Sequence, residues 1–168
     1  MNENRFRHEV LPLKDRLFRL ALRITLNRED AEDIVQETMV RAWREMQQQD
    51  IGNMEAFCTT ICHNLSIDHR QRREQQNITF DTSLHDVADI APNADERISH
   101  EERISQLRML LDQLPEKQRI AIQLRDIEGQ TYRDIAQIMQ ITENDVKINI
   151  FRARQRLKEH AARLHTSR

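Results

Sequence analysis

The stretch from Gly129 to Lys158 constrains the fold more than any other part of the chain, because it repeats one helix-start pattern within a few residues. Thr131 is followed three residues later by Asp134, and Thr142 is followed three residues later by Asp145. Such a threonine caps a helix, and a carboxylate three residues on can reach free amide groups of the first turn. Two helices joined by so short a turn cross steeply. The stretch therefore predicts a helix-turn-helix, whose second helix enters a DNA major groove.

The second helix of this pair has two different faces at about 100° per residue. One face is apolar and is expected to pack against the preceding helices; it consists of Val146, Ile150, Ala153 and Leu157. The opposite face carries residue types that bind base edges and thymine methyl groups. Its candidate DNA-binding residues are Lys147, Ile148, Asn149, Phe151, Arg152 and Gln155. Residues 141–168 hold seven Lys or Arg and three Asp or Glu, a charge that also suits a solvated helix at the end of a bundle.

The composition favours helices throughout the 168 residues. There are only two glycines and three prolines, and Gly52, Gly129, Pro12 and Pro115 stand where helices are expected to break. The formal net charge is −2, so any nucleic-acid surface must come from local segregation of charge. No apolar run is long enough to span a membrane and the N-terminus lacks a signal-peptide core, so we expect a cytoplasmic protein.

Three amphipathic helices are expected in the N-terminal half. They cover approximately residues 12–25, 27–47 and 54–73, and the loop Gln47–Asn53 separates the last two. Pro12 suits the first turn of the first helix, and Asn27 is a candidate cap for the second. The third helix ends in a polar and basic tail from Asn64 to Arg73. This tail is either a nucleic-acid surface or a set of cations that complements the helix dipole.

The second of these helices opens with a strongly acidic segment. Glu29 and Asp30 lie in its first turn, where carboxylates suit the helix dipole. Asp33 and Glu37 lie beyond the reach of that effect, which leaves them unexplained. Trp43, the single tryptophan, is expected to lie in the core rather than to stack on a base.

Cys58 and Cys62 lie four residues apart on the third helix, next to His63, which raises the question of a metal or redox site. Both cysteines fall within the apolar stripe of that helix, and they complete no zinc ligand set. Buried free cysteine behaves as a small apolar side chain. We therefore expect both to be structural.

The sequence gives no sign of catalysis or of a bound cofactor. It contains no glycine-rich phosphate loop, no nucleophile with a base nearby and no metal ligand set. Glu32, Asp33 and Glu37 come from a single helix with no histidine beside them, which makes a weak metal site.

A change of character between about residue 74 and residue 100 divides the chain. Residues 74–100 hold six Asp or Glu and one Arg, with few apolar residues and no periodicity, which predicts a flexible acidic linker. We expect an all-α fold with one domain over 1–73, a linker over 74–99 and a second domain over 100–168. The second domain should bury two apolar stripes, one of Ile104, Leu107, Leu110, Leu111 and Leu114 and one of Ile120, Ala121, Leu124 and Ile127.

Two separated parts of the chain resemble bacterial sigma factors. The segment Asp30–Trp43 resembles the helix of their conserved region two, and Leu114–Arg119, Glu128–Ala136 and Val146–Arg156 resemble their region four. With two such domains and a linker, the chain is similar to the extracytoplasmic-function (ECF) group. The resemblance covers roughly residues 10–73 and 100–160, and it implies a promoter-specificity subunit of RNA polymerase.

The resemblance also implies a role for each surface. The second helix would dock on the β′ clamp helices of RNA polymerase through Asp33, Gln36 and Glu37. The loop and the tail of the third helix would capture the melted minus-ten strand through Asn53, Asn64, Asp68, His69, Arg70 and Arg73. Region four would bind the minus-thirty-five element and rest on the β flap, and the acidic linker would run towards the RNA exit channel. An anti-sigma factor is a further implied partner.

Three residues of the DNA-binding helix depart from the family pattern. Lys147 and Asn149 stand where many relatives carry arginine, and Ile148 stands where a small polar residue is common. The promoter sequence is therefore open, and Ile148 points to a thymine methyl group.

Two other functions remain open on the sequence. An autonomous helix-turn-helix regulator that binds an operator would need a sensor or dimerisation surface in the N-terminal half, where no ligand pocket is indicated. A protein whose helices bind only other proteins would not depend on Lys147 and Arg152.

Overall fold

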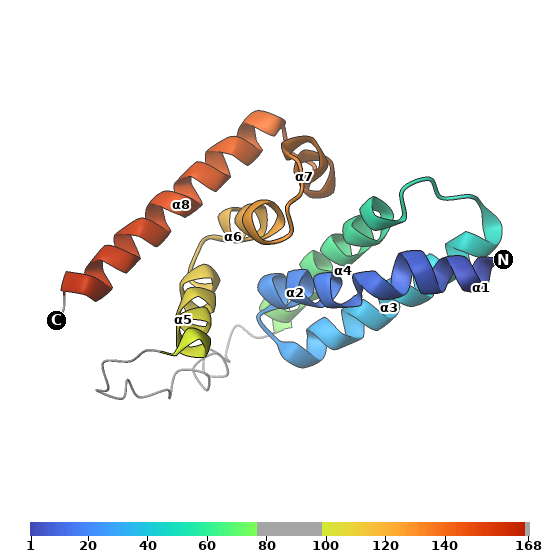
Figure 1. Ribbon diagram of the computed structural model, residues 1–168, viewed down its shortest axis with the longest axis horizontal. Coiled ribbons are helices and arrows are strands. Elements are labelled where there is room, and N and C mark those ends of the chain that lie inside the picture. Colours follow the sequence, from blue (N-terminus) through green and yellow to red (C-terminus); the bar gives the residue numbers. More distant parts are fainter. Residues whose placement is uncertain (77–98, 167–168) are drawn as a thin grey trace.

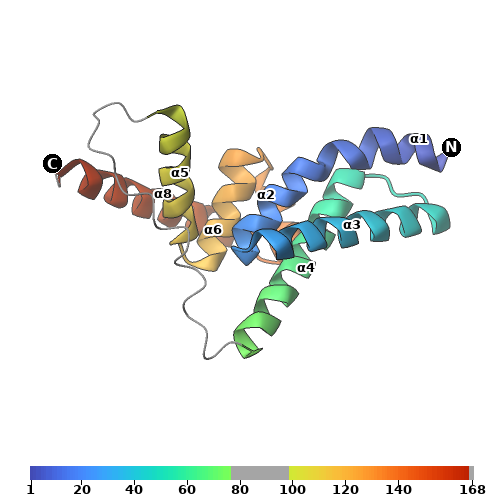
Figure 2. The ribbon, with the colours of Figure 1, turned by 90° about the horizontal axis from the view of Figure 1, so that it is seen from below.

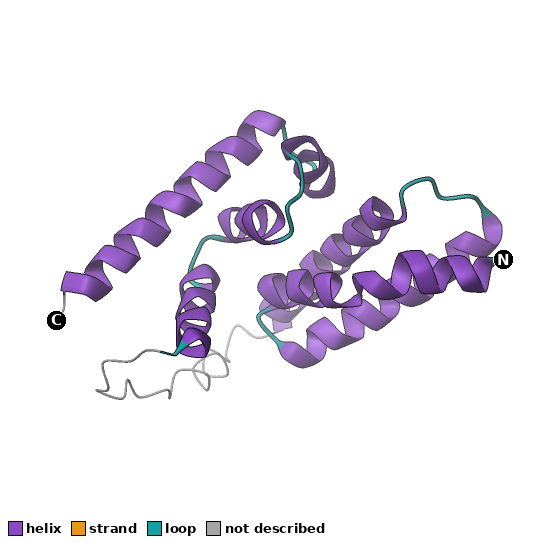
Figure 3. Cartoon of the chain, in the orientation of Figure 1, coloured by secondary structure: helices purple, strands orange, loops and turns teal. Residues whose placement is uncertain are grey.

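The protein is described here by a computed structural model that covers residues 1–76 and 99–166, and every regular element in these two ranges is helical (Figures 1 and 3). The all-α expectation is thus confirmed. The α-helices are α1 (Asn2–Arg5), α2 (Lys14–Thr25), α3 (Arg28–Gln48), α4 (Met54–Gln76), α5 (His100–Asp112), α6 (Glu116–Ile122), α7 (Tyr132–Met139) and α8 (Glu143–Thr166). Most of the expected linker lies outside the described residues.

The helices α2, α3 and α4 pack on one another as the first bundle, in which α4 runs steeply across the direction of α3 (Figure 2). Leu17, Leu20 and Ile24 of α2 are almost fully buried between the other two helices. Asn27 caps α3 as expected, because its side chain accepts a 2.9 Å hydrogen bond from the amide of Asp30. Burial therefore follows the apolar periodicity of the sequence in this bundle.

The two cysteines of α4 are core residues, as predicted. Cys58 and Cys62 are free and fully buried, and the thiol of Cys62 donates to the carbonyl of Leu17 over 3.3 Å. Burial raises the pKa of each thiol to about 12. Because the thiolate is the reactive form, neither cysteine is poised for redox or metal chemistry.

A helical segment precedes α2 that the sequence did not predict. After α1, the chain continues through a π-helical turn (Phe6–Val10) and a 3₁₀ turn (Leu11–Leu13), and the π-helical turn contacts α3 and α4. Phe6 meets the indole ring of Trp43 edge-on, with the ring centroids 5.4 Å apart. The expectation that Trp43 lies in the core is wrong, since it is 38% exposed. It lies on a face of α3 that this segment covers in part, through Phe6.

The second domain, α5 to α8, buries its apolar residues less completely than its sequence predicts. Leu111 and Leu114 are buried with Ala153 of α8, but Ile104 and Leu107 are 36% and 47% exposed. The reason is that α5 lies apart from the other helices over most of its length (Figures 1 and 2). Among the described residues, its apolar stripe therefore packs against a neighbour near the C-terminal end, at Leu111 and Leu114.

The helix α6 runs into a π-helical turn (Gln123–Ile127) that changes which residues face inward. Leu124 is buried as expected, but Ile127 is 44% exposed, so its predicted inward position is wrong. A π-helical turn contains more residues than an α-helical turn, so positions after it rotate off the face that α-helical spacing predicts. Gly129 then ends the element with a φ of 71°, a conformation that suits glycine.

The two domains pack against each other and share one apolar core. Leu17 and Leu20 of the first domain belong to the same buried cluster as Ile120, Leu124 and Ile135 of the second. The contacts join α2 to α6 and α4 to α7. The described residues thus form a closed arrangement, which the sequence did not foretell.

Replacing Leu20 by Ala tests this shared core. Leu20 is 1% exposed, so the free energy of unfolding should fall by about 2–4 kcal/mol through lost burial and a new cavity. Leu11→Ala is the control, because Leu11 is 44% exposed and should change stability by less than about 1 kcal/mol. Urea unfolding followed by circular dichroism measures both, and equal effects would contradict the described core.

Candidate nucleic-acid interface

The helix-turn-helix predicted from the sequence is present in α7 and α8. The hydroxyl of Thr131 accepts a 3.1 Å hydrogen bond from the amide of Asp134, and that of Thr142 accepts a 3.0 Å bond from Asp145. Between the helices, Gln140 takes a left-handed conformation with a φ of 56°, which lets the chain reverse within the three-residue turn over residues 140–142. Both predicted caps are therefore confirmed.

The helix α8 presents the predicted DNA-binding face to solvent. Val146, Ile150 and Ala153 are buried on the opposite face. Ile148 and Phe151 are 38% and 63% exposed, a costly placement for apolar side chains unless another molecule covers them. The charged and polar candidates Lys147, Arg152 and Gln155 are also exposed.

Two of the candidate side chains on α8 are already held by the protein. The amide group of Asn149 donates a 2.9 Å hydrogen bond to the carbonyl of Asp145, which keeps it along the helix. The ammonium group of Lys147 lies 5.6 Å from the ring centroid of Tyr132, a cation–π contact with α7. Lys147 is thus oriented by the first helix of the pair.

The six residues predicted to capture a melted strand do not form one cluster. Asn53 precedes α4 and caps it, because its side chain accepts a 3.0 Å bond from the amide of Ala56. The loop before α4 covers only Gln49–Asn53, since the first two residues of the predicted loop belong to α3. Arg73 lies in the last turns of α4, about 30 Å from Asn53 at 1.5 Å per residue.

The remaining five residues divide between two faces of α4. Asn64 and Asp68 are exposed and lie within about 40° of each other around the helix. His69 and Arg73 point to the start of α3, where His69 lies 3.6 Å from Asp30 and Arg73 forms an ion pair with the same carboxylate. Asn64 and Asp68 therefore face solvent along the tail of α4, although the side-chain oxygen of Asn64 lies 3.1 Å from the imidazole of His63.

Arg70 connects the tail of α4 to the second domain. Its guanidinium group lies 2.9 Å from the carboxylate of Glu116 at the start of α6 and 3.2 Å from that of Glu74. Arg70 can therefore reach a DNA phosphate only after it leaves Glu116. The neighbouring His63 is buried, and loss of solvation lowers the pKa of its imidazole.

The acidic residues predicted to bind a protein partner lie together on α3. Asp33, Gln36 and Glu37 are all exposed and fall within about 100° of each other around the helix. The carboxylate of Glu37 accepts a 3.0 Å hydrogen bond from Arg41 one turn later. None of the three contributes to the apolar core, so this face is available to a partner.

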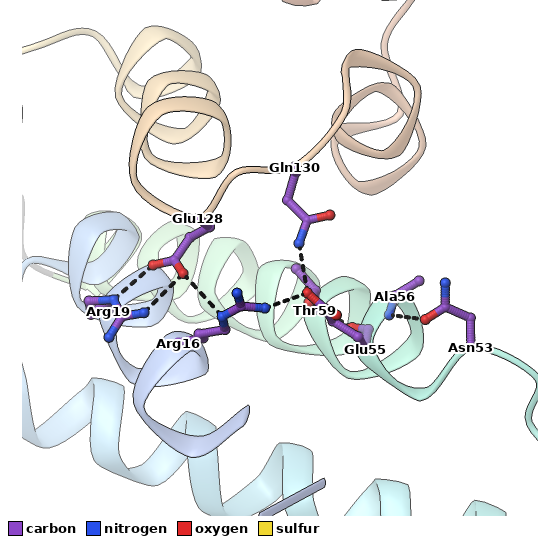
Figure 4. A network of polar contacts seen from close by, with 8 residues as sticks. All are labelled: Arg16, Arg19, Asn53, Glu55, Ala56, Thr59, Glu128 and Gln130. Atoms are coloured by element: carbon purple, nitrogen blue, oxygen red, sulfur yellow. Dashed lines mark hydrogen bonds and ion pairs between the residues drawn. The ribbon is translucent and has the colours of Figure 1, made fainter. Parts of the chain in front are cut away.

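A buried carboxylate that sequence reasoning missed joins the two domains (Figure 4). The side chain of Glu128 is only 5% exposed and accepts hydrogen bonds from Arg19 at 2.8 and 3.0 Å. These bonds raise the pKa of the Arg19 guanidinium. Arg16 lies 3.8 Å from Glu128 and 2.7 Å from Glu55, whose carboxylate also accepts from Gln130 over 3.1 Å.

A third arginine of α2 continues this network. Arg23 is buried and donates to Gln123 over 3.1 Å and to Asp112 over 2.5 Å. Residues 16, 19 and 23 are spaced so that they share one face of α2. This row of arginines along one face of an amphipathic helix was the sequence feature that could have predicted a contact with acidic groups of the second domain.

Two family models match the chain over its two domains. Residues 10–76 match sigma-70 region 2, and residues 104–157 match sigma-70 region 4. The chain is 31% identical over 153 residues to the ECF RNA polymerase sigma factor EcfG of Rhodopseudomonas palustris, an alignment that covers 90% of this chain and 82% of that protein. The chain belongs to the ECF sigma factors.

Further relatives agree with this assignment. The ECF RNA polymerase sigma factor SigE of Mycolicibacterium smegmatis is 36% identical over 157 residues, which cover 91% of this sigma factor and 60% of that longer protein. Among solved structures, the sigma factor RpoE of Bartonella quintana, in complex with the anti-sigma factor NepR, superposes with a TM-score of 0.71. That comparison covers 92% of this chain and 94% of RpoE at 26% identity.

Two further findings apply to residues 1–76 and 99–166 alone. No helix there is long and apolar enough to cross a membrane. No three His, Cys, Asp or Glu side chains there gather into a group that could hold a metal ion.

The Glu128→Gln substitution tests the junction between the domains. A neutral amide accepts hydrogen bonds from Arg19 more weakly, so closure should weaken by about 1 kcal/mol, a small value because Arg19 is 44% exposed. We expect a larger radius of gyration in small-angle X-ray scattering. Asp126→Asn is the matched control, because Asp126 pairs with Arg154 at 2.6 Å within the second domain. If both variants expand equally, Glu128 does not hold the domains together.

Proposed function

We propose that this sigma factor directs core RNA polymerase to promoters, with residues 1–73 as the region-two domain and residues 100–168 as the region-four domain. The observation that carries the proposal is the exposed, partly apolar DNA-binding face of α8, set on a doubly capped helix-turn-helix in an ECF sigma factor. On this proposal the protein acts in the cytoplasm and has no catalytic activity of its own. The polymerase supplies the chemistry.

In the proposal, α8 binds the minus-thirty-five element as duplex DNA. Lys147 and Arg152 supply positive charge for phosphates and guanine edges, and Gln155 can hydrogen-bond a base. Ile148 and Phe151 lose their exposed apolar surface against thymine methyl groups. This accounts for two apolar side chains that solvent would otherwise face.

The minus-ten element is bound as a melted strand by the first domain. The exposed side chains Asn53, Asn64 and Asp68 can hydrogen-bond unpaired bases, and cations at the end of α4 attract the backbone. His69, Arg70 and Arg73 exchange their carboxylate partners for phosphates in this proposal. The acidic face of Asp33, Gln36 and Glu37 binds the β′ clamp helices of the polymerase, and region four rests on the β flap.

Promoter binding requires the two domains to separate. The two elements lie about 25 base pairs apart, roughly 85 Å along straight duplex DNA. In the closed arrangement Arg70 of the first domain instead contacts Glu116 of the second. Separation therefore frees Arg70 for the melted strand at the same time as it lets the domains span the promoter.

An anti-sigma factor that binds the closed arrangement is part of the proposal. Its support is the superposition of this chain, over 92% of its length, on a sigma factor in complex with an anti-sigma factor. Such a partner would stabilise the closed arrangement by mass action.

Run-off transcription with core polymerase on a promoter library tests the proposed function. We expect transcripts from a subset of promoters that share two sequence elements. The Lys147→Glu and Arg152→Glu double variant should lose at least about tenfold in activity on these promoters, because two cationic contacts become repulsive. Its activity should match that of the unchanged protein on promoters with a scrambled minus-thirty-five element.

Two outcomes would contradict the proposal. A chain that never directs initiation and never co-purifies with core polymerase is not acting as a sigma factor. Tight, sequence-specific binding of duplex DNA without core polymerase would instead identify an autonomous operator-binding regulator.

Glu37→Lys tests the polymerase-binding face of α3. Charge reversal should weaken binding to core polymerase by roughly tenfold, because a rim charge at the interface becomes repulsive. Glu3→Lys is a matched control: Glu3 and Arg7 form the same kind of one-turn pair, at 2.7 Å, away from this face. Competition for core polymerase against a labelled sigma factor gives both affinities, and unchanged binding by Glu37→Lys would refute the assigned role.

A further inference from the structure

The first ten residues hold the loop that the proposed function places at the melted strand. We call residues 2–10 the N-terminal segment. Nearly all of it precedes the match to sigma-70 region 2, which begins at residue 10. It nevertheless packs against α3 and α4, and its first residues lie beside the loop Gln49–Asn53. The segment therefore adds contacts that lie outside the matched part of region two.

Arg5 is the residue of this segment that contacts the loop most extensively. Its Nη1 donates to the carboxylate of Asp50 over 2.5 Å, and its Nη2 donates to the backbone carbonyl of Ile51. Its Nε is held 3.1 Å from both carboxylate oxygens of Glu9, one turn later in the same segment. The hydrogen bonds that Arg5 donates to Glu9 and Asp50 raise the pKa of its guanidinium group. All three guanidinium nitrogens are thus engaged, two of them on consecutive loop residues.

Two neighbours of Arg5 fix the segment on the end of α3. The side-chain amide of Asn2 donates to the carbonyl of Met46 over 3.2 Å, one of the acceptors that the end of a helix leaves free. Phe6 packs edge-on against Trp43, as described above. Arg5 therefore reaches the loop from a base that is itself anchored.

The two ends of the loop are held by neighbouring helices, because Gln49 bonds back to α3 and Asn53 caps α4. Between these ends Ile51 is buried, whereas Asp50 and Gly52 are exposed. A pocket that selects one unpaired base needs its backbone held in one conformation before the base arrives. The carbonyl of Ile51 is the point at which Arg5 supplies this constraint.

We infer that Arg5 is a positioning residue, which sets the conformation of the Gln49–Asn53 loop for capture of an unpaired minus-ten base. The inference rests on the proposed function. Arginine suits the task, since its planar group serves Glu9, Asp50 and the Ile51 carbonyl together, whereas a lysine ammonium has no such fork. The ion pair with Asp50 constrains the loop little by itself, because the Asp50 carboxylate is 89% exposed.

The test uses holoenzyme, assembled from core polymerase and the full sigma factor. Two labelled single strands serve as probes: the non-template minus-ten strand of a promoter selected by run-off transcription, and the same strand with one base changed. The ratio of the two affinities measures base discrimination. Arg5→Ala should lower affinity for the selected strand by roughly tenfold and bring the ratio close to one, because the loop loses two hydrogen bonds to a charged group.

Two further variants separate positioning from folding. Arg7→Ala is the matched control, since Arg7 pairs with Glu3 in the same segment and should leave the ratio unchanged. Arg5→Lys keeps the charge without the fork and should give an intermediate ratio. Equal melting temperatures and equal affinities for core polymerase show that the variants are folded. If Arg5→Ala is unfolded, the ratio of Arg5→Lys decides.

The possible results distinguish this inference from the function on which it rests. If the affinity ratio of Arg5→Ala stays within twofold of that of the unchanged protein, the role of Arg5 is overturned. Where Arg5→Ala is unfolded, the same limit applies to Arg5→Lys. A ratio near one for the unchanged holoenzyme would overturn the proposed role of the loop itself.

Discussion

The contact between Glu128 and the arginines of α2 is the interaction on which the closed arrangement depends. A carboxylate with 5% of its side chain exposed has lost most of its solvation, and the bonds from Arg19 and Gln123 compensate, together with the nearby charge of Arg16. Such a pair gives little net stability, although breaking one side of it is costly. It therefore specifies how the domains meet more than it strengthens their contact. Apolar contacts between α2 and α6 contribute the attraction.

This balance suits a protein whose domains are proposed to separate. Arg119 contributes to the same junction: it is buried, and loss of solvation lowers the pKa of its guanidinium to about 10. Its contact with the carbonyl of Ile24 in the first domain is long, at 3.5 Å. Buried charges at the junction regain hydration when the domains part, which offsets the loss of the apolar contacts. The apolar contacts thus stabilise the closed arrangement, while the buried charges lower the free-energy cost of opening it.

The exposed surfaces assign different physical tasks to different helices. The α8 face combines cations with Ile148 and Phe151, which suits the proposed duplex binding, while the α3 face is acidic and also exposes the apolar side chain of Val40. The loop before α4 is held by Arg5 from outside as well as by its own residue Asn53, which caps α4. The three proposed binding surfaces are therefore kept rigid in different ways. The α8 face belongs to a capped helix pair, the α3 face belongs to a helix of the first bundle, and the loop is anchored by Arg5.

Sequence alone determined the features that depend on local chemistry. The caps of Thr131 and Thr142, the buried cysteines of α4 and the exposure of Ile148 follow from side-chain type and helical spacing, which act over a few residues. Only the tertiary structure decided the exposure of Trp43, because that depends on whether another segment covers its face of α3. It likewise decided that Ile127 lies outside the core, because a π-helical turn shifts the register there. The contact of Arg70 with Glu116 was beyond the reach of any spacing rule, since Glu116 comes from the other domain.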